Sequence, residues 1–263
     1  MEKAIALERI GISGGYGKDG QPEPVREVEF RMGQVVSIVG ATGSGKTTLI
    51  KDIELLANKN TPSNRTVTFN GVIPSEEYYP MPSDRLIALI TQHTNFLSDM
   101  RVEDFLATHA SIRGSGRESS IVNETLMFAN QLTGEPVDIN SAMTELSGGQ
   151  TRALMIADAV VIGESPIILL DEIENAGIHR TKVLELLKQY KKIFIFVTHD
   201  PRITLLSDFR IVMQNGAMQS IIVTNAEEKK VVEQVKKIDD LLLRLRAYIR
   251  SGETITEAHL KEQ

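Results

Sequence analysis

A glycine-rich stretch near the amino terminus carries the residues best suited to chemistry. It follows the pattern of a glycine, any four residues, a glycine, a lysine and a hydroxyl residue, which is typical of loops that bind phosphate. Small residues let the backbone wrap around a phosphate chain, so that the backbone amides point inward. The stretch, called the P-loop below, consists of Gly40, Ala41, Thr42, Gly43, Ser44, Gly45, Lys46, Thr47 and Thr48.

The flanks of the P-loop supply the elements that this pattern needs. Residues 35–39 have the composition of a short buried strand, and residues 48–56 have helical spacing. The positive end of that helix would face the phosphates. We therefore expect Lys46 to reach the β- and γ-phosphates of a nucleotide and the Thr47 hydroxyl to bind Mg²⁺.

A second candidate is an apolar run that ends in two acids. Residues 167–170 are followed by Asp171 and Glu172. An acid at a strand tip can hold Mg²⁺ directly or through water, which is the role expected for Asp171. Glu172 points elsewhere and could polarise an attacking water. An ordinary strand end is the alternative, and the P-loop earlier in the chain favours the metal site.

A third candidate opens a predicted helix that continues to Ile162. Ser147 offers a hydroxyl and the helix end offers free amides, which together form a second anion site. A plain capped helix is the alternative. Two anion sites in one chain suggest that the second site of one subunit closes over the γ-phosphate held by another. The stretch consists of Leu146, Ser147, Gly148, Gly149 and Gln150.

Composition excludes several kinds of protein. The chain has 263 residues, 41% of them hydrophobic and 24% charged, with a formal net charge of −6. The acidic balance argues against a protein that coats nucleic acid. The absence of cysteine excludes disulfides and iron–sulfur ligation by this chain. No apolar run approaches the length needed to span a bilayer. We therefore expect a cytoplasmic protein that reaches the inner face of the cell membrane only through a partner.

The carboxyl-terminal region predicts a long amphipathic helix. Asn225 and Glu228 have the spacing of a capping box, and Gly252 would end the helix. Its apolar residues recur at alternating steps of four and three, as in a heptad seam. The helix could pack on the protein's own core, or it could dock a partner or a second copy. The seam residues are Val231, Val235, Ile238, Leu242, Leu245 and Ile249.

Taken together, these motifs resemble the ATP-binding-cassette (ABC) ATPase family. The resemblance runs from Ile5 to about Val223 in the family's order and spacing, and the sequence from Leu146 to Gln150 matches the family signature without substitution. The resemblance implies that Gln92 contacts Mg²⁺, that His199 contacts the γ-phosphate and that Tyr16 stacks on adenine. The alternatives are a polar strand end, a structural loop histidine and an exposed loop tyrosine.

The chain departs from the family pattern after Glu172. Many members continue with Pro, a hydroxyl residue and then Ser-Ala-Leu-Asp, whereas here Ile178 stands where the aspartate is expected. In the family this segment crosses the dimer interface. The change puts in doubt the usual coupling between two sites, but it leaves the phosphate loop and Glu172 untouched.

The resemblance and the pattern of strands and helices predict an α/β fold. We expect a P-loop NTPase core with a mixed, largely parallel sheet, an antiparallel β subdomain, an inserted helical subdomain and a carboxyl-terminal amphipathic helix. Asn70 and Gly71, between two short apolar runs, predict a tight hairpin. The expected division is 1–95 and 145–224 for the RecA-like ATP-binding core, 96–144 for the helical subdomain and 225–263 for the tail.

The expected function is ATP hydrolysis in a head-to-tail homodimer that forms on ATP binding. Lys46, Glu172 and His199 would carry catalysis, while Thr47, Gln92 and Asp171 would hold Mg²⁺. Two kinds of partner fit. The first is the membrane-spanning permease of a transporter, and the second is a soluble protein client that the ATPase remodels or matures. No nucleic-acid partner is expected.

Overall fold

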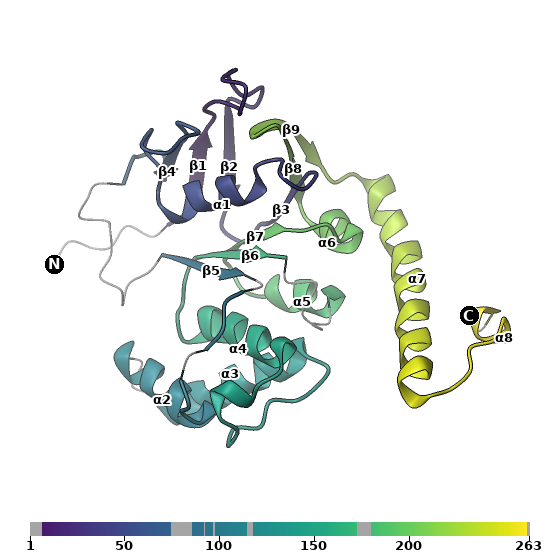
Figure 1. The fold of residues 1–263 in the computed structure, drawn as a ribbon. Helices are drawn as coiled ribbons and strands as arrows, with labels where there is room; N and C mark the ends of the chain where they lie inside the picture. The colour runs from purple at the N-terminus through teal and green to yellow at the C-terminus, as the bar shows by residue number, and fades with distance from the viewer. Residues whose placement is uncertain are drawn as a thin grey trace.

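The computed structural model describes residues 7–74, 86–91, 93–96, 98–114, 118–172 and 180–261. Gln92 and the segment 173–178 lie outside these described residues. The described chain forms two sheets, with helices on both faces of the larger one (Figure 1).

The larger sheet has six strands in the order β5-β6-β7-β3-β8-β9. The first five strands in this order run parallel to one another, and β9 pairs antiparallel with β8. β7 is buried along its whole length, as expected for a continuous apolar strand covered on both faces. The bounds are β3 Val35–Val39, β5 Ile87–Thr91, β6 Ile167–Asp171, β7 Ile193–Val197, β8 Phe209–Gln214 and β9 Ala217–Val223.

Alternate side chains of the central strands enter two separate cores, because successive residues of a strand point to opposite faces. Leu169 and Ile195 pack with the apolar face of helix α1 (Lys46–Glu54) and with the smaller sheet. Leu170 and Phe196 pack with the helices on the opposite face. The P-loop helix is thus anchored between the two sheets (Figure 1).

The smaller sheet is antiparallel, in the order β2-β1-β4. Asn70 and Gly71 adopt the positive φ angles of 51° and 84° that a tight turn needs. The expected tight hairpin is confirmed, because Phe69 N donates to Val72 O at 2.8 Å and Val72 N donates to Phe69 O at 2.9 Å. Val72 is exposed and its pairing with Phe69 is an isolated bridge, so β4 is joined to the smaller sheet through β1. The bounds are β1 Arg9–Ser13, β2 Glu27–Arg31 and β4 Thr66–Phe69.

Helices cover the other face of the larger sheet (Figure 1). The predicted helical character of the region between 96 and 144 is confirmed, since α2 and α3 lie within it. Its status as a separate subdomain stays a prediction. The bounds are α2 Val102–Ile112, α3 Glu118–Leu132, the short 3-10 helix η3 Met143–Glu145, α4 Gly148–Val161, α5 Arg180–Leu187 and α6 Pro201–Leu206.

The chain ends in the long helix α7 (Ala226–Ser251) and the short helix α8 (Ala258–Lys261). The predicted capping box is confirmed, because Glu228 N donates to Asn225 Oδ1 at 2.9 Å. Gly252 ends α7 with a φ of 79°. Among the described residues, no helix has both the length and the apolar character needed to cross a membrane.

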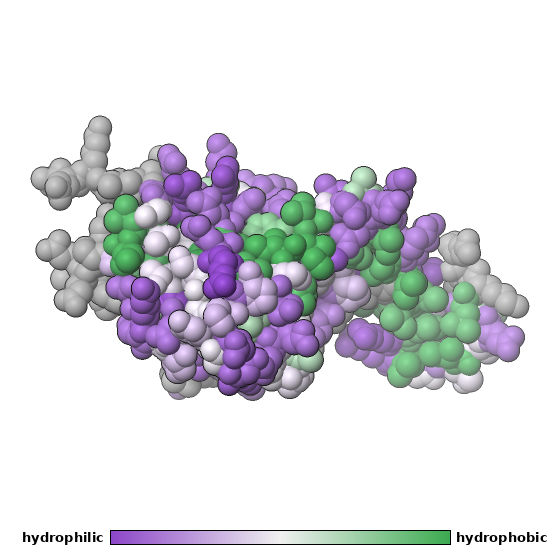
Figure 2. All heavy atoms as spheres, turned by 90° about the horizontal axis from the view of Figure 1, so that it is seen from above, coloured by the Kyte–Doolittle hydropathy of each residue, from purple (hydrophilic) through white to green (hydrophobic). Residues whose placement is uncertain are grey.

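The heptad seam of α7 is largely exposed to solvent. Val232 near the start of the helix is buried, and Arg210 on β8 pairs with Glu228 at 2.6 Å. Farther along, Ile238 and Ile249 are 60% and 63% exposed. Figure 2 shows apolar atoms gathered on this part of the molecule. The seam residues therefore do not pack on the protein's own core, and docking of a partner or a second copy stays a prediction.

Lys192, just before β7, provides a test of stability against pH. Its Nζ donates to Ser165 O at 3.0 Å, and burial lowers the pKa of Lys192 from 10.5 to about 8, although Glu164 acts in the opposite direction. Burial of the charged form destabilises the fold below pH 8. Between about pH 8 and 10.5 the unfolded chain binds a proton that the folded chain has released, so this contribution to stability rises with pH.

We expect Lys192→Met to raise the Tm at pH 7 by about 2–4 °C, which corresponds to about 1 kcal/mol. The gain should shrink as the pH approaches about 10, because the wild-type side chain is then neutral when folded. Calorimetric unfolding at both pH values measures the difference. Lys191→Met, at an exposed neighbour, is the matched control and should show no such gain. An equal gain for Lys192→Met at both pH values would contradict this account.

Candidate active site

The P-loop joins β3 to the first turn of α1. Gly45 stands at the N-cap with a φ of 103°, no side chain caps the helix and its first turn contains no acid. The first amides of a helix lack partners within the helix, so they can donate to an anion. A side chain at Gly45 would place its Cβ 2.8 Å from the Cα of Gly216. Glycine is therefore required here by both backbone conformation and space.

Lys46 is buried in the P-loop, with only 6% of its surface exposed. Its Nζ donates to Gly40 O at 2.8 Å and to Ala41 O at 3.1 Å. Ser44 Oγ is also buried and has no hydrogen-bond partner in the described part of the chain. An ammonium held by carbonyl oxygens and an orphaned hydroxyl are both available to a phosphate oxygen, so the loop fits a nucleotide.

The carboxyl ends of β6, β7 and β3 share one edge of the larger sheet, because these strands are adjacent and parallel. This edge places Asp171 at the end of β6, His199 just after β7 and the P-loop after β3. Neighbouring strands are about 4.8 Å apart, so the acids lie within about two strand spacings of the P-loop strand. The structure thus brings together the residues that the sequence placed in separate motifs.

Glu172 and His199 face each other across this edge. His199 Nε2 lies 3.6 Å from Glu172 Oε1, and their side chains are 50% and 31% exposed. Glu172 N donates to Val197 O at 3.0 Å, which ties the acid to the end of β7. Glu172 has a φ of 51°, a conformation that is strained for a residue with a side chain. Strained residues cluster at active sites, which fits a functional role for Glu172.

The loop that carries His199 is fixed on both sides. Thr198 is fully buried, and Asp200 N donates to Thr198 Oγ1 at 2.9 Å. The Asp200 side chain caps α6 and also binds the Arg202 guanidinium at 3.0 Å. His199 therefore projects from a rigid frame toward solvent and Glu172.

Tyr16 lies in the glycine-rich turn after β1 and is 48% exposed. Its backbone N donates to Ser63 O at 2.8 Å. Two residues later, Lys18 Nζ donates to Gly43 O in the P-loop at 2.8 Å. Lys18 was missed in the sequence because a lysine in a glycine-rich turn carries no motif. Its proximity to the P-loop places the Tyr16 turn at the mouth of the phosphate site.

The residues available for Mg²⁺ are oxygen donors. Thr47 is exposed on the first turn of α1, and Asp171 is partly exposed at the tip of β6. No group of three or more histidine, cysteine, aspartate or glutamate side chains that could hold a metal occurs in the described ranges. This set suits Mg²⁺, which is usually held by one or two carboxylates together with phosphate oxygens and water. Gln92, the third predicted ligand, lies outside the described residues.

The predicted signature from Leu146 to Gln150 stands at the amino-terminal end of α4. Ser147 Oγ accepts a hydrogen bond from Gln150 N at 3.3 Å, and Gln150 Oε1 accepts from Ser147 N at 2.9 Å. Ser147 and Gly148 are exposed, and Gly149 is partly exposed. α4 and α1 pack on opposite faces of the larger sheet. The fold therefore presents the signature to solvent and not to the P-loop of the same chain.

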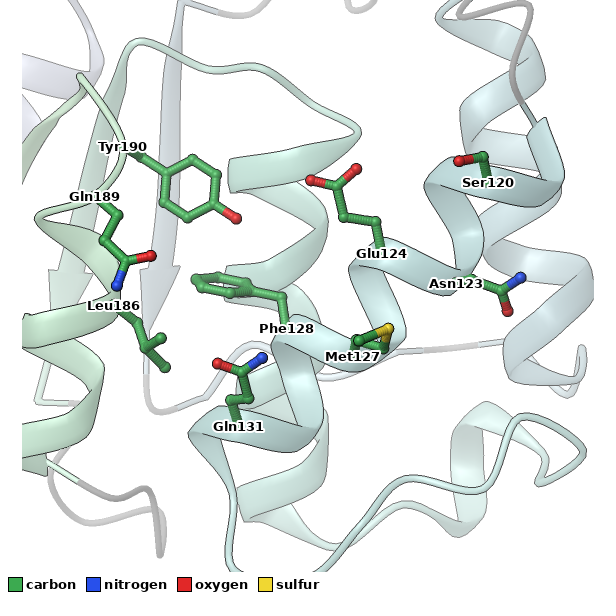
Figure 3. A pocket seen from close by; sticks show the side chains of 9 residues that line it. All are labelled: Ser120, Asn123, Glu124, Met127, Phe128, Gln131, Leu186, Gln189 and Tyr190. Carbon is green, nitrogen blue, oxygen red and sulfur yellow. The ribbon is translucent and has the colours of Figure 1, made fainter.

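A separate hollow of about 440 Å³ lies between α3 and α5 (Figure 3). The Phe128 and Tyr190 rings pack edge to face there, with their centroids 5.2 Å apart. Burial, together with the nearby charge of Glu124, raises the pKa of Tyr190. None of the predicted site residues lines this hollow, so it is not the phosphate site.

The strand, glycine loop and helix, with two acids at the tip of a neighbouring strand, define a P-loop nucleotide-binding protein. The family model for "ABC transporter" matches residues 26–175. The chain belongs to the ABC transporter family, and it is an ATP-binding subunit with ATPase activity.

Relatives agree with this assignment, and solved structures share the fold. An ABC transporter ATP-binding protein of Methanocaldococcus jannaschii, MJ0121, is 51% identical over 96% of both chains. The lipoprotein-releasing system ATP-binding protein LolD 1 of Chlorobium luteolum is 30% identical over 82% of this chain and 97% of its own. Among structures, a dimeric ATP-binding cassette in a post-hydrolysis state with ADP and Pi has a TM-score of 0.61 at 22% identity, covering 82% of this chain and 99% of that one. CbiO1 of Clostridium perfringens has a TM-score of 0.60 at 21% identity, covering 92% and 97%.

Proposed function

We propose that two copies of this chain meet head to tail and enclose two ATP molecules, each held between the P-loop of one copy and Ser147, Gly148 and Gly149 of the other. The observation that carries the proposal is the exposure of Ser147 and Gly148 at a helix end that does not face its own P-loop. The amides at this helix end that the Ser147 cap leaves free can bind an anion, and the γ-phosphate on a second copy supplies one. The γ-phosphate then bridges the two copies, so hydrolysis would open the dimer.

The roles of the site residues in this proposal follow from their placement. Lys46 and the P-loop amides neutralise the charge that develops on the phosphates. Glu172 orients the attacking water. His199, whose Nε2 lies 3.6 Å from the Glu172 carboxylate, would contact the γ-phosphate. Thr47, Asp171 and Gln92 would hold Mg²⁺, which would supply neutralisation of the phosphate charge.

The output of this cycle is proposed to drive membrane-spanning permease subunits on the cytoplasmic side of a membrane. The names of the relatives support this partner, because one is an ABC transporter ATP-binding protein and another is the ATP-binding protein of a lipoprotein-releasing system. The helical region 96–144 is the proposed contact. Met127 in this region is exposed and lines the hollow between α3 and α5. Together with Phe128 of α3 and Leu186 of α5, it offers an apolar surface (Figure 3).

Ser147→Asp tests the arrangement between subunits. Aspartate caps a helix as well as serine does and suits the positive helix end, so α4 should keep its stability. Its carboxylate would repel the γ-phosphate of the partner's ATP. We expect the turnover to fall about 100-fold and the ATP-dependent dimer to be lost. The ATP affinity of the monomer should stay within about twofold of wild type, because the variant leaves the P-loop of the same chain intact.

Steady-state ATPase assays and size-exclusion chromatography with Mg-ATP measure both effects. Ser119→Asp, in the exposed first turn of α3, is the matched control and should behave as wild type. Hydrolysis by Ser147→Asp at the wild-type rate would show that Ser147 does not face a γ-phosphate.

A further inference from the structure

A fully buried ion cluster lies beneath the turn that carries Tyr16. Arg65 on the approach to β4 pairs with Glu23, and its Nη1 donates to Asp52 Oδ2 at 2.7 Å. All three side chains are at most 2% exposed. Buried charges destabilise a fold unless they are paired and hydrogen bonded, and this cluster meets that condition. Asp52 belongs to α1, so the cluster joins the P-loop helix to β4 and to the segment 14–23.

Glu23 extends the cluster to the backbone of two other segments. Its carboxylate accepts hydrogen bonds from Gly15 N at 2.8 Å and from Met218 N at 2.7 Å. A Cβ at Gly15 would lie only 1.8 Å from Ser63 O. The turn next to Tyr16 is therefore packed against β9 and against residues 63–65, which lead into β4. No space is left at Gly15 for a side chain.

The turn between β8 and β9 continues the connection to the P-loop. Arg65 Nη2 donates to Gly216 O at 2.7 Å, and Gly216 N donates to Ser44 O at 2.8 Å. On its other side, Lys18 N donates to Asn215 O at 2.8 Å. The Asn215–Gly216 turn thus lies between the segment with Tyr16 and Lys18 and the phosphate loop, and Arg65 supports it from the core.

We propose that Arg65, Glu23 and the Asn215–Gly216 turn are positioning residues that fix Tyr16 and Lys18 against the P-loop. They set the affinity for the adenosine half of ATP through Tyr16 and Lys18, and they do not themselves contact the nucleotide. The inference rests on the proposed function, because it takes the Tyr16 turn as the adenine side of the site. It predicts that disturbing these residues weakens binding of ATP selectively, while binding of a bare phosphate chain is preserved.

Gly216→Ala is the sharpest test. Gly216 has a φ of 81°, and an added Cβ would lie 2.8 Å from Lys18 Cγ and 3.0 Å from Lys18 N, so the segment must move. We expect the Kd for ATP to rise about tenfold, because base stacking is lost. The Kd for inorganic tripolyphosphate, which needs only the P-loop, should change less than about twofold. Isothermal titration calorimetry of the full chain measures both.

Gly33→Ala is the matched control. Gly33 also has a positive φ, 89°, but an added Cβ there would meet nothing within 4 Å. It imposes the same backbone strain without moving the segment, so both affinities should equal those of wild type. A second variant, Arg65→Lys, keeps the charge but lacks the planar fork that binds Glu23, Asp52 and Gly216 O together, and it should reproduce the selective loss.

The outcomes separate this inference from the proposed function. Equal weakening of ATP and tripolyphosphate binding, or an unchanged ATP affinity in Gly216→Ala, overturns the positioning role alone. In a Tyr16→Ala background, Gly216→Ala should add little further loss, since the two changes act through one contact. Wild-type protein that binds ATP no better than tripolyphosphate overturns the adenine assignment of Tyr16 as well.

Discussion

Replacing Glu172 with glutamine is expected to lower ATP turnover by about 10²- to 10⁴-fold while leaving ATP binding intact. Glutamine keeps the size of the side chain, and the backbone bond from residue 172 to Val197 O is unaffected. The amide has no carboxylate to accept a proton from the attacking water. ATP bound by this variant should persist, so the dimer should accumulate in the presence of Mg-ATP.

Single-turnover hydrolysis and light scattering with and without Mg-ATP measure these two effects. Glu54→Gln, at an exposed position near the end of α1, is the control and should keep wild-type turnover. If the Glu172→Gln protein stays monomeric in excess Mg-ATP, the proposed enclosure of ATP between two copies is wrong. If it turns over normally, another residue must orient the water.

Lys46→Ala is expected to weaken ATP binding by about 100-fold or more. The lysine ammonium is the charged donor of the loop, and hydrogen bonds to a charged group contribute about 1.5–3 kcal/mol each. Its described partners are the carbonyl oxygens of Gly40 and Ala41. ATP would replace these with phosphate oxygens, which attract an ammonium more strongly than carbonyls do.

Isothermal titration calorimetry gives the Kd directly, and the unfolding temperature shows whether the loop stays folded. Lys51→Ala, at an exposed position of the same helix, should leave the Kd within about twofold of wild type. An unchanged affinity in Lys46→Ala would contradict the assignment of the P-loop as the phosphate site.

The sequence predicted those elements whose signals are local. Continuous apolar runs at β6 and β7 indicated buried parallel strands, and Ser147 and Asn225 marked the starts of α4 and α7. In each case a few adjacent residues determine the conformation. The candidate P-loop was found in the same way, because the spacing of its glycines and lysine is itself the requirement of the site.

The sequence could not predict contacts that join distant segments. Arg65 binds Glu23, which is 42 residues away in the sequence, and Gly216, which is 151 residues away. No pattern in one of these segments predicts which residue of another it will contact. The turn at Asn70 and Gly71 was predicted correctly because its chemistry is local. The pairing of β4 with β1 was not predicted, because it depends on burial of Val67 and Phe69 against distant segments.

The exposed seam of α7 illustrates a further limit. A heptad pattern predicts that a helix has an apolar face, but it does not predict what covers that face. The described fold buries Val232 near the start of the helix and leaves Ile238 and Ile249 in solvent. Periodicity alone therefore could not decide between packing on the core and docking.

Because α7 is attached mainly at its start, its far half can unfold locally while the sheets stay folded. Its amino-terminal turn is joined to β8 by the Arg210–Glu228 pair, whereas the far half exposes its apolar residues and contributes little to either core. Fraying from Gly252 backward therefore breaks few tertiary contacts. Amide hydrogen exchange in the last turns of α7 should report this local unfolding, while exchange in β6 and β7 requires cooperative unfolding of the whole sheet.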